Sequence, residues 1–76
     1  MKIIIYTAEG CPWCKKTKEF LKQNNVEYKE IDVGKDKKAA EEMVKKSGHM
    51  GVPVIDIDGK IIVGFDEEKL RGALRL

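Results

Sequence analysis

The spacing of the hydrophobic residues changes early in the chain, and this change predicts a strand followed by a helix. Residues 2–6 form an almost continuous apolar run, which is typical of a strand buried on both faces. From Pro12 to Leu21 the apolar side chains recur at helical spacing. Proline favours the first position of a helix, because the N–H that it lacks would have no partner there. We expect the helix to end at Asn24-Asn25.

The middle of the chain predicts three further strands. Residues 26–33 alternate imperfectly, which indicates either a bulged strand or a short strand at the edge of a sheet. Residues 54–57 and 60–63 flank Asp58-Gly59, a pair that is typical of a type I′ turn between two antiparallel strands.

Polar residues and a glycine mark the ends of two more predicted helices. Asp36 is expected to cap a helix that ends at Gly48, and Asp66 is expected to cap a last helix. The apolar residues expected to face the core are Ala39, Ala40, Met43 and Val44 in the first, and Leu70, Ala73 and Leu74 in the second. The lysines of residues 35–46 are expected to form a solvated helix face, with an acidic docking surface as the alternative.

The predicted order of elements is β-α-β-α-β-β-α. A right-handed, parallel first βαβ unit and a final hairpin give a four-stranded mixed sheet with helices on both faces. The sequence therefore predicts one α/β domain over residues 1–76.

Composition and charge exclude several classes of function. The chain has 76 residues, of which 42% are hydrophobic and 37% charged, and its net charge of +2 is too weak for a nucleic-acid surface. No apolar stretch approaches the roughly 18 residues of a membrane span, and the N-terminus does not follow the pattern of a signal peptide. We therefore expect a cytoplasmic protein. In that reducing compartment, a close cysteine pair is more often catalytic or metal-binding than structural.

The only two cysteines stand at Cys11-Pro12-Trp13-Cys14, where the first predicted helix begins. In such a motif the helix N-terminus lowers the pKa of a thiol from about 8.5 to about 3.5–7.5. Cys11 is therefore expected to attack a disulfide as a thiolate. Cys14 lies one turn further along, on the apolar face, and is expected to resolve the mixed disulfide. Trp13 is expected to be a partly exposed aromatic residue that suits the docking of a peptide or thiol substrate, with a core position as the alternative.

A zinc site is a weaker interpretation of the same cysteines. Structural zinc sites normally have four protein ligands, and the chain offers only Cys11, Cys14 and a lone His49.

Three further segments accompany the cysteine pair. Together they make the whole chain resemble the glutaredoxins and glutaredoxin-like redoxins of the thioredoxin fold. The matching segments are Tyr6-Thr7, Cys11-Pro12-Trp13-Cys14, Gly51-Val52-Pro53 and Gly64-Phe65-Asp66-Glu67.

This resemblance implies a monomeric thiol–disulfide oxidoreductase with no bound cofactor or metal. Its substrates would be protein disulfides and glutathione mixed disulfides, with glutathione as cosubstrate. Pro53 would be cis and lie opposite Cys11, the Val52 backbone would pair with an extended substrate, and Asp66 would receive one end of glutathione. The alternatives to these roles are that Pro53 only starts a strand and that Asp66 only caps a helix. The substrate-binding residues so implied are Tyr6, Pro12, Trp13, Val52, Pro53, Gly64, Phe65 and Asp66.

The chain also departs from the glutathione-dependent members. Ala8 stands where those members often have a lysine, Gly51 replaces a threonine, and Val63 replaces the first of two glycines. The sequence Val63-Gly64-Phe65 is instead similar to redoxins that serve ribonucleotide reductase and are recharged by thioredoxin reductase. That role is the alternative function.

A binding protein is a third possibility, from a different class. Some glutaredoxins bridge an iron–sulfur cluster between two chains through the first cysteine and glutathione. Such carriers commonly have a single active cysteine, so the presence of Cys14 favours the enzyme.

Overall fold

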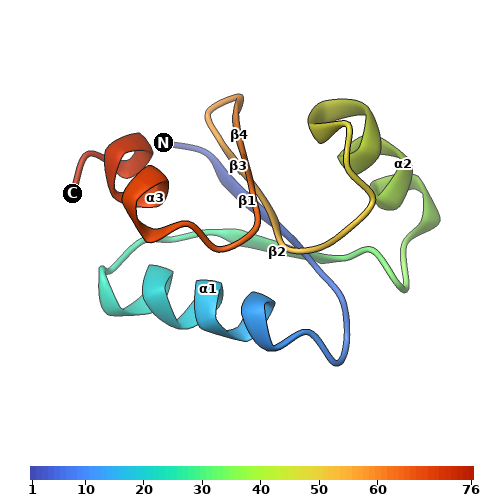
Figure 1. Cartoon of the computed structure of the whole chain (residues 1–76), viewed down its shortest axis with the longest axis horizontal. Helices are drawn as coiled ribbons and strands as arrows, with labels where there is room; N and C mark the ends of the chain where they lie inside the picture. Colours follow the sequence, from blue (N-terminus) through green and yellow to red (C-terminus); the bar gives the residue numbers. More distant parts are fainter.

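A computed structural model describes residues 1–76 and contains four strands and three helices (Figure 1). The sheet order is β2-β1-β3-β4, with β1 parallel to β2 and antiparallel to β3, and with β3 antiparallel to β4. The predicted β-α-β-α-β-β-α order and mixed sheet are therefore confirmed. The elements are β1 (Ile3–Thr7), α1 (Pro12–Gln23), β2 (Lys29–Asp32), α2 (Lys37–Ser47), β3 (Val54–Ile57), β4 (Lys60–Val63) and α3 (Glu67–Leu74).

The helices cover both faces of the sheet, because side chains alternate along the central strand β1. Ile3 and Ile5 point to the face that packs against α1 and α3, whereas Tyr6 points to the face that packs against α2. Figure 1 shows α2 set apart from the other two helices. The larger cluster contains Ile3, Ile5, Phe20, Leu21, Ile55, Ile57, Ile62, Leu70 and Leu74, and the smaller one contains Tyr6, Ala39, Met43 and Val54. Burial of each large side chain stabilises the fold by about 1.5–3 kcal/mol.

The predicted caps and the hairpin turn are confirmed. Asp36 and Asp66 each accept a hydrogen bond from the backbone N–H three residues later, at 3.0 and 3.1 Å. Gly48 ends α2 in the left-handed conformation, with φ +68°. Asp58 and Gly59 both have positive φ, as a type I′ turn requires.

Two predicted details differ from the structure. The second strand is a short edge strand that spans only Lys29–Asp32, because the Val26 N–H donates to the Leu21 carbonyl (2.9 Å) and continues the turn at the end of α1. Val44 is exposed, because α2 buries Ala39 and Met43, and Val44 lies about 100° further round the helix. None of the three helices is long and apolar enough to cross a membrane.

Candidate functional site

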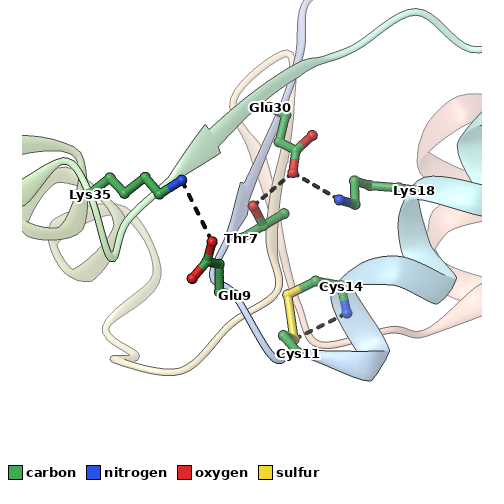
Figure 2. Close-up of polar contacts among 7 residues, drawn as sticks. All are labelled: Thr7, Glu9, Cys11, Cys14, Lys18, Glu30 and Lys35. Carbon is green, nitrogen blue, oxygen red and sulfur yellow. Dashed lines mark hydrogen bonds and ion pairs between the residues drawn. A yellow bond between two sulfur atoms is a disulfide. The ribbon is translucent and has the colours of Figure 1, made fainter.

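Cys11 occupies the N-cap of α1, directly before Pro12 in the first helical turn. Its backbone is extended, and its Sγ accepts a hydrogen bond from the Cys14 N–H at 3.1 Å. The two cysteines form a disulfide at the end of the loop that follows β1 (Figure 2). A sulfur at this position faces unpaired backbone N–H groups, which stabilise negative charge.

The two sulfurs differ in their access to solvent. Cys14 is only 1% exposed, whereas Cys11 is partly exposed at the start of the helix. Cys14 shares the buried face of α1 with Thr17, Phe20 and Leu21. A bulky substrate can therefore approach Cys11 but not Cys14, which agrees with the roles expected from the sequence.

The loop before β3 faces Cys11. The Val52–Pro53 peptide bond is cis, and the Val52 carbonyl oxygen lies 3.8 Å from Cys11 Sγ. The expectation of a cis proline opposite Cys11 is thus confirmed. The Gly64 N–H donates to the Pro53 carbonyl at 2.8 Å and connects this loop to the turn after β4. Gly64 has φ +80°, a conformation that side-chain-bearing residues rarely adopt.

Two hollows flank the disulfide. The larger, about 560 Å³, is lined by residues of the active-site loop and of the first turns of α1, and the smaller, about 230 Å³, lies on the cis-proline side. The larger is lined by Ala8, Glu9, Gly10, Cys11, Pro12, Cys14, Lys15 and Lys18. The smaller is lined by Trp13, Val52, Pro53, Gly64 and Phe65. Five of the substrate-binding residues expected from the sequence therefore meet in one hollow.

An aromatic row forms one wall of the smaller hollow. Trp13 is 55% exposed, as expected, and stacks on Phe65 with ring centroids 6.2 Å apart. Phe65 in turn meets the edge of Phe20, a buried residue of α1, at 5.9 Å. Lys16 Nζ lies 5.0 Å from the Trp13 ring centre, close enough for a cation–π contact.

Two of the expected site residues, Tyr6 and Asp66, line neither hollow and make structural contacts. The implied role of Tyr6 in substrate binding is corrected, because its ring is fully buried. Its hydroxyl accepts a hydrogen bond from Lys46 Nζ at 2.8 Å. The Asp66 carboxylate caps α3 through the Lys69 N–H, and Asp66 does not line the smaller hollow.

Lys46 belongs to the lysines of residues 35–46, which are expected from the sequence to form a solvated helix face. Its ammonium bridges Tyr6 and the Asp56 carboxylate, which it reaches at 2.9 Å. The hydrogen bonds to Tyr6 and Asp56 raise the pKa of Lys46. Burial opposes ionisation of Asp56, but the hydrogen bonds from Lys46 and from the Gly59 N–H outweigh it and lower the Asp56 pKa. No periodicity distinguishes Lys46 from its neighbours, so only the single acidic residue of the apolar strand β3, Asp56, could have suggested a buried partner.

Figure 2 shows a second polar cluster, drawn above the disulfide, which consists of Thr7, Lys18 and Glu30. Glu30 Oε2 accepts hydrogen bonds from Lys18 Nζ (2.9 Å) and the Thr7 hydroxyl (3.1 Å). The hydrogen bond from Lys18 lowers the pKa of Glu30. This cluster connects α1, β1 and β2 beside the active-site loop. The Glu9–Lys35 pair, at 3.6 Å, is largely exposed and contributes little to stability.

The cysteines lack the neighbours that a metal centre needs. No group of three or more His, Cys, Asp or Glu side chains is placed to hold a metal ion. His49 packs against Gly51, where an added Cβ would come within 2.8 Å of its Nε2. A side chain at position 51 would therefore require the exposed His49 ring to move.

Comparisons with known proteins agree with this geometry. The glutaredoxin family model matches residues 3–62. A glutaredoxin-like 8.6 kDa protein of the Clostridium pasteurianum rubredoxin operon is 52% identical over 90% of this chain and 91% of its own. Glutaredoxin 3 of Escherichia coli K12 is 40% identical over 83% of this chain and 76% of its own. The crystal structure of an Archaeoglobus fulgidus glutaredoxin superposes with a TM-score of 0.91 at 35% identity, and covers 99% of this chain and 87% of that one.

These matches, the thioredoxin-like fold and the cysteine pair at a helix start lead to one conclusion: the chain belongs to the glutaredoxin family and is a thiol–disulfide oxidoreductase of the dithiol type.

Proposed function

We propose that this protein reduces disulfides of other proteins, with Cys11 as the attacking thiol and Cys14 as the resolving thiol. The observation that supports this division of roles is the difference in exposure between Cys11 at the helix N-cap and Cys14 in the core. The protein acts as a monomer in the reducing cytoplasm.

The first step is an exchange of sulfur bonds. In the reduced enzyme, the Cys11 thiolate attacks one sulfur of the substrate disulfide and forms a mixed disulfide. The substrate bond breaks, and its other sulfur leaves as a thiolate that takes a proton from water. The Cys14 N–H stabilises the attacking thiolate before the reaction.

The second step returns the enzyme to the state seen in the structure. Cys14 loses its proton and attacks Cys11 Sγ, so the mixed disulfide breaks and the substrate leaves with both cysteines reduced. The product is the Cys11–Cys14 disulfide. A thiol donor or a flavoprotein reductase then supplies the two electrons that regenerate the dithiol.

Glutathione is proposed as a usable but mediocre reductant and cosubstrate. Ala8 lines the larger hollow beside Cys11, where glutathione-dependent relatives often carry a lysine that would attract a glutathione carboxylate. Glutathione mixed disulfides are accordingly a secondary substrate class.

A second candidate role is electron donation to ribonucleotide reductase, with recharging by thioredoxin reductase. The feature that favours it is the Val63-Gly64-Phe65 turn, which brings Phe65 against Trp13 at the rim of the site. A coupled assay that offers glutathione with its reductase, or thioredoxin reductase, distinguishes the two donors.

The Cys14→Ser variant tests the proposed roles. Without the resolving thiol, the mixed disulfide between Cys11 and a protein substrate should accumulate and be visible on non-reducing gels and by mass spectrometry. The matched Cys11→Ser variant should form no such complex. Turnover of protein disulfides by Cys14→Ser at the parent rate, without a trapped species, would show that the assignment is wrong.

A further inference from the structure

A hollow of about 470 Å³ lies on the exposed face of α2 and shares no lining residue with the two hollows beside the disulfide. Val44 is 38% exposed and Met50 is 83% exposed, although both are large apolar residues. Neither belongs to a core cluster, so the packing of the fold does not account for this apolar surface. The hollow is lined by Lys37, Ala40, Glu41, Val44, Lys45 and Met50.

Two unpaired cations stand at the rim of this hollow. Lys37 and Lys45 line it from the first and last turns of α2, and neither ammonium has a carboxylate within 4.0 Å. Lys46, by contrast, is paired with Asp56. The one acidic residue of the rim, Glu41, lies between the two lysines. A partner with a carboxylate opposite each lysine would gain two charge-assisted hydrogen bonds, whereas a basic partner would face two like charges.

The spacing of the two lysines defines the shape of an occupant. Lys45 follows Lys37 by eight residues, which corresponds to about 12 Å along a helix axis. An extended peptide advances about 3.3–3.6 Å per residue, so carboxylates three or four positions apart would face the two ammonium groups. A large apolar side chain between those carboxylates would lie over Ala40, Val44 and Met50, and would gain by leaving water.

The hollow is too small to hold two whole proteins together by itself. Only six residues line it, whereas each partner of a stable complex contributes about 20–30 residues. A second copy of this chain, docked through this patch alone, would therefore not bind stably. A segment of a substrate protein is different, because the mixed disulfide already joins that protein to Cys11. The second contact is then intramolecular, so a small patch is sufficient.

The hollow lies close to the reacting cysteine. Met50 precedes Val52 by two residues, which span at most about 7 Å of extended chain. The Val52 carbonyl oxygen in turn lies 3.8 Å from Cys11 Sγ. In Figure 1 the chain runs from the end of α2 directly to the start of β3. A substrate held at Cys11 can therefore reach the hollow with residues that lie a short distance along its own chain.

We propose that the hollow on α2 is a docking site for a short acidic segment of a substrate protein, in which two carboxylates three or four residues apart flank a large apolar side chain. The proposal rests on the proposed function and names a substrate class for it, namely proteins whose reactive cysteine lies near such a segment. The segment contacts α2 while the substrate cysteine reacts with Cys11.

Symmetric peptide disulfides test the docking site without a reductase. Each capped peptide carries one cysteine, a glycine-serine spacer of varied length and, before or after the cysteine, the segment Glu-Ala-Leu-Glu. Matched peptides replace both glutamates by glutamine, or the leucine by asparagine. The pre-reduced protein is mixed with each peptide, and formation of the Cys11–Cys14 disulfide is followed by acid quench and mass spectrometry. With at least one spacer, the acidic segment should raise the second-order rate constant at least about fivefold over either matched peptide at low ionic strength. Added salt should reduce its advantage over the glutamine peptide.

Variants of the hollow identify where the segment binds. The double variant Lys37→Glu/Lys45→Glu should bring the ratio of the acidic to the glutamine peptide to about one or lower, because two attractions become repulsions. The matched control Lys29→Glu/Lys38→Glu changes the net charge equally at exposed lysines outside the hollow, and should keep most of the preference. Val44→Asn should lower the leucine-to-asparagine ratio. Each ratio compares two substrates on one protein, so a general loss of reactivity does not imitate the expected result.

The outcomes separate the docking site from the function. Equal rates for the acidic peptide and either matched peptide at every spacer length would overturn the docking site and leave the oxidoreductase role intact. A preference that survives in Lys37→Glu/Lys45→Glu would do the same. Dimerisation of the parent in analytical ultracentrifugation, abolished by Val44→Asn, would assign the hollow to a second copy and also overturn the proposal. Failure of every peptide to oxidise the reduced protein would instead contradict the proposed function.

Discussion

The carbonyl oxygen of Val52 lies 3.8 Å from the sulfur of Cys11, although 41 residues separate the two in the chain. A carbonyl oxygen accepts hydrogen bonds from backbone N–H groups. A substrate strand that donates to Val52 would therefore present its cysteine to Cys11. On the helix side, the Cys14 N–H donates a hydrogen bond to Cys11 Sγ at 3.1 Å, and the same donor would stabilise the proposed Cys11 thiolate in the reduced protein. The fold thus brings the proposed nucleophile, Cys11, next to the backbone that is proposed to bind the substrate.

Alkylation of the reduced protein should reveal Cys11 as the reactive thiol. Its place at the N-cap of α1 stabilises the thiolate, so the reaction rate plotted against pH should have a midpoint clearly below the value of about 8.5 for a free cysteine. Peptide mapping by mass spectrometry identifies the modified residue. A midpoint near that of a free thiol, or modification of Cys14 first, would contradict the assignment.

The Ala8→Lys variant should use glutathione several-fold faster than the parent. A cation at this wall of the larger hollow would attract a glutathione carboxylate by about 1 kcal/mol at 4 Å in water. The initial rate with a glutathionylated substrate, at fixed ionic strength, measures the effect. Reduction by thioredoxin reductase should barely change and serves as the control. An unchanged glutathione rate would show that Ala8 does not weaken the glutathione site.

Substitutions of Asp66 should separate its capping role from a role in glutathione binding. Asparagine caps helices about as well as aspartate, so Asp66→Asn should retain the stability of the parent, whereas Asp66→Ala should lose about 1 kcal/mol. Urea unfolding followed by circular dichroism measures both. If Asp66 also binds the ammonium end of glutathione, Asp66→Asn should lower only the glutathione-dependent rate. Equal glutathione rates in parent and Asp66→Asn would leave the cap as its sole role.

The Lys46→Met variant should be destabilised by about 1–3 kcal/mol at pH 7, because it removes charged hydrogen bonds to Tyr6 and Asp56 and leaves a largely buried carboxylate unpaired. The free energy of unfolding in urea gives the value. Lys45→Met, an exposed neighbour in the same helical turn, is the matched control and should change little. Equal stability of the two variants would mean that the bridge contributes nothing.

The stability of the parent should fall as the pH drops below about 4. The folded-state pKa values of Asp56 and Glu30 lie below their ordinary values of 3.8 and 4.5, so the unfolded chain binds protons before the folded protein does. Lys46 has a raised pKa, and its contribution is lost only at strongly alkaline pH.

The same reasoning predicts how Lys46→Met changes this profile. Without the Lys46 cation, Asp56 keeps the unfavourable effect of burial, the hydrogen bond from Gly59 and the attraction of Lys2, so its pKa is higher than in the parent. The deficit of the variant relative to the parent should therefore be greatest near neutral pH and shrink below about pH 4, where Asp56 is protonated. A deficit that is constant from pH 3 to 7 would assign the loss to packing alone.

Much of the fold follows from local signals in the sequence. The caps at Asp36 and Asp66 and the Asp58-Gly59 turn are local backbone requirements that need no distant partner, so their residue types predict them. The switch to helical spacing at Pro12 likewise predicts both the start of α1 and a thiol at its N-cap. The start of the second strand was not predictable in this way, because Val26 is a residue type that favours strands but belongs to the turn that ends the preceding helix.

The sequence by itself determined the type of chemistry, since a cysteine pair at a helix start favours a reversible dithiol, and too few other ligands accompany it for a structural zinc site. Only the tertiary structure decided what surrounds that pair. Contacts between residues far apart in the chain, such as Trp13 with Phe65 and Lys46 with Tyr6, leave no periodic signal, because they depend on how the elements pack. The same packing buries Tyr6 and forms the uncharged hollow beside Pro53.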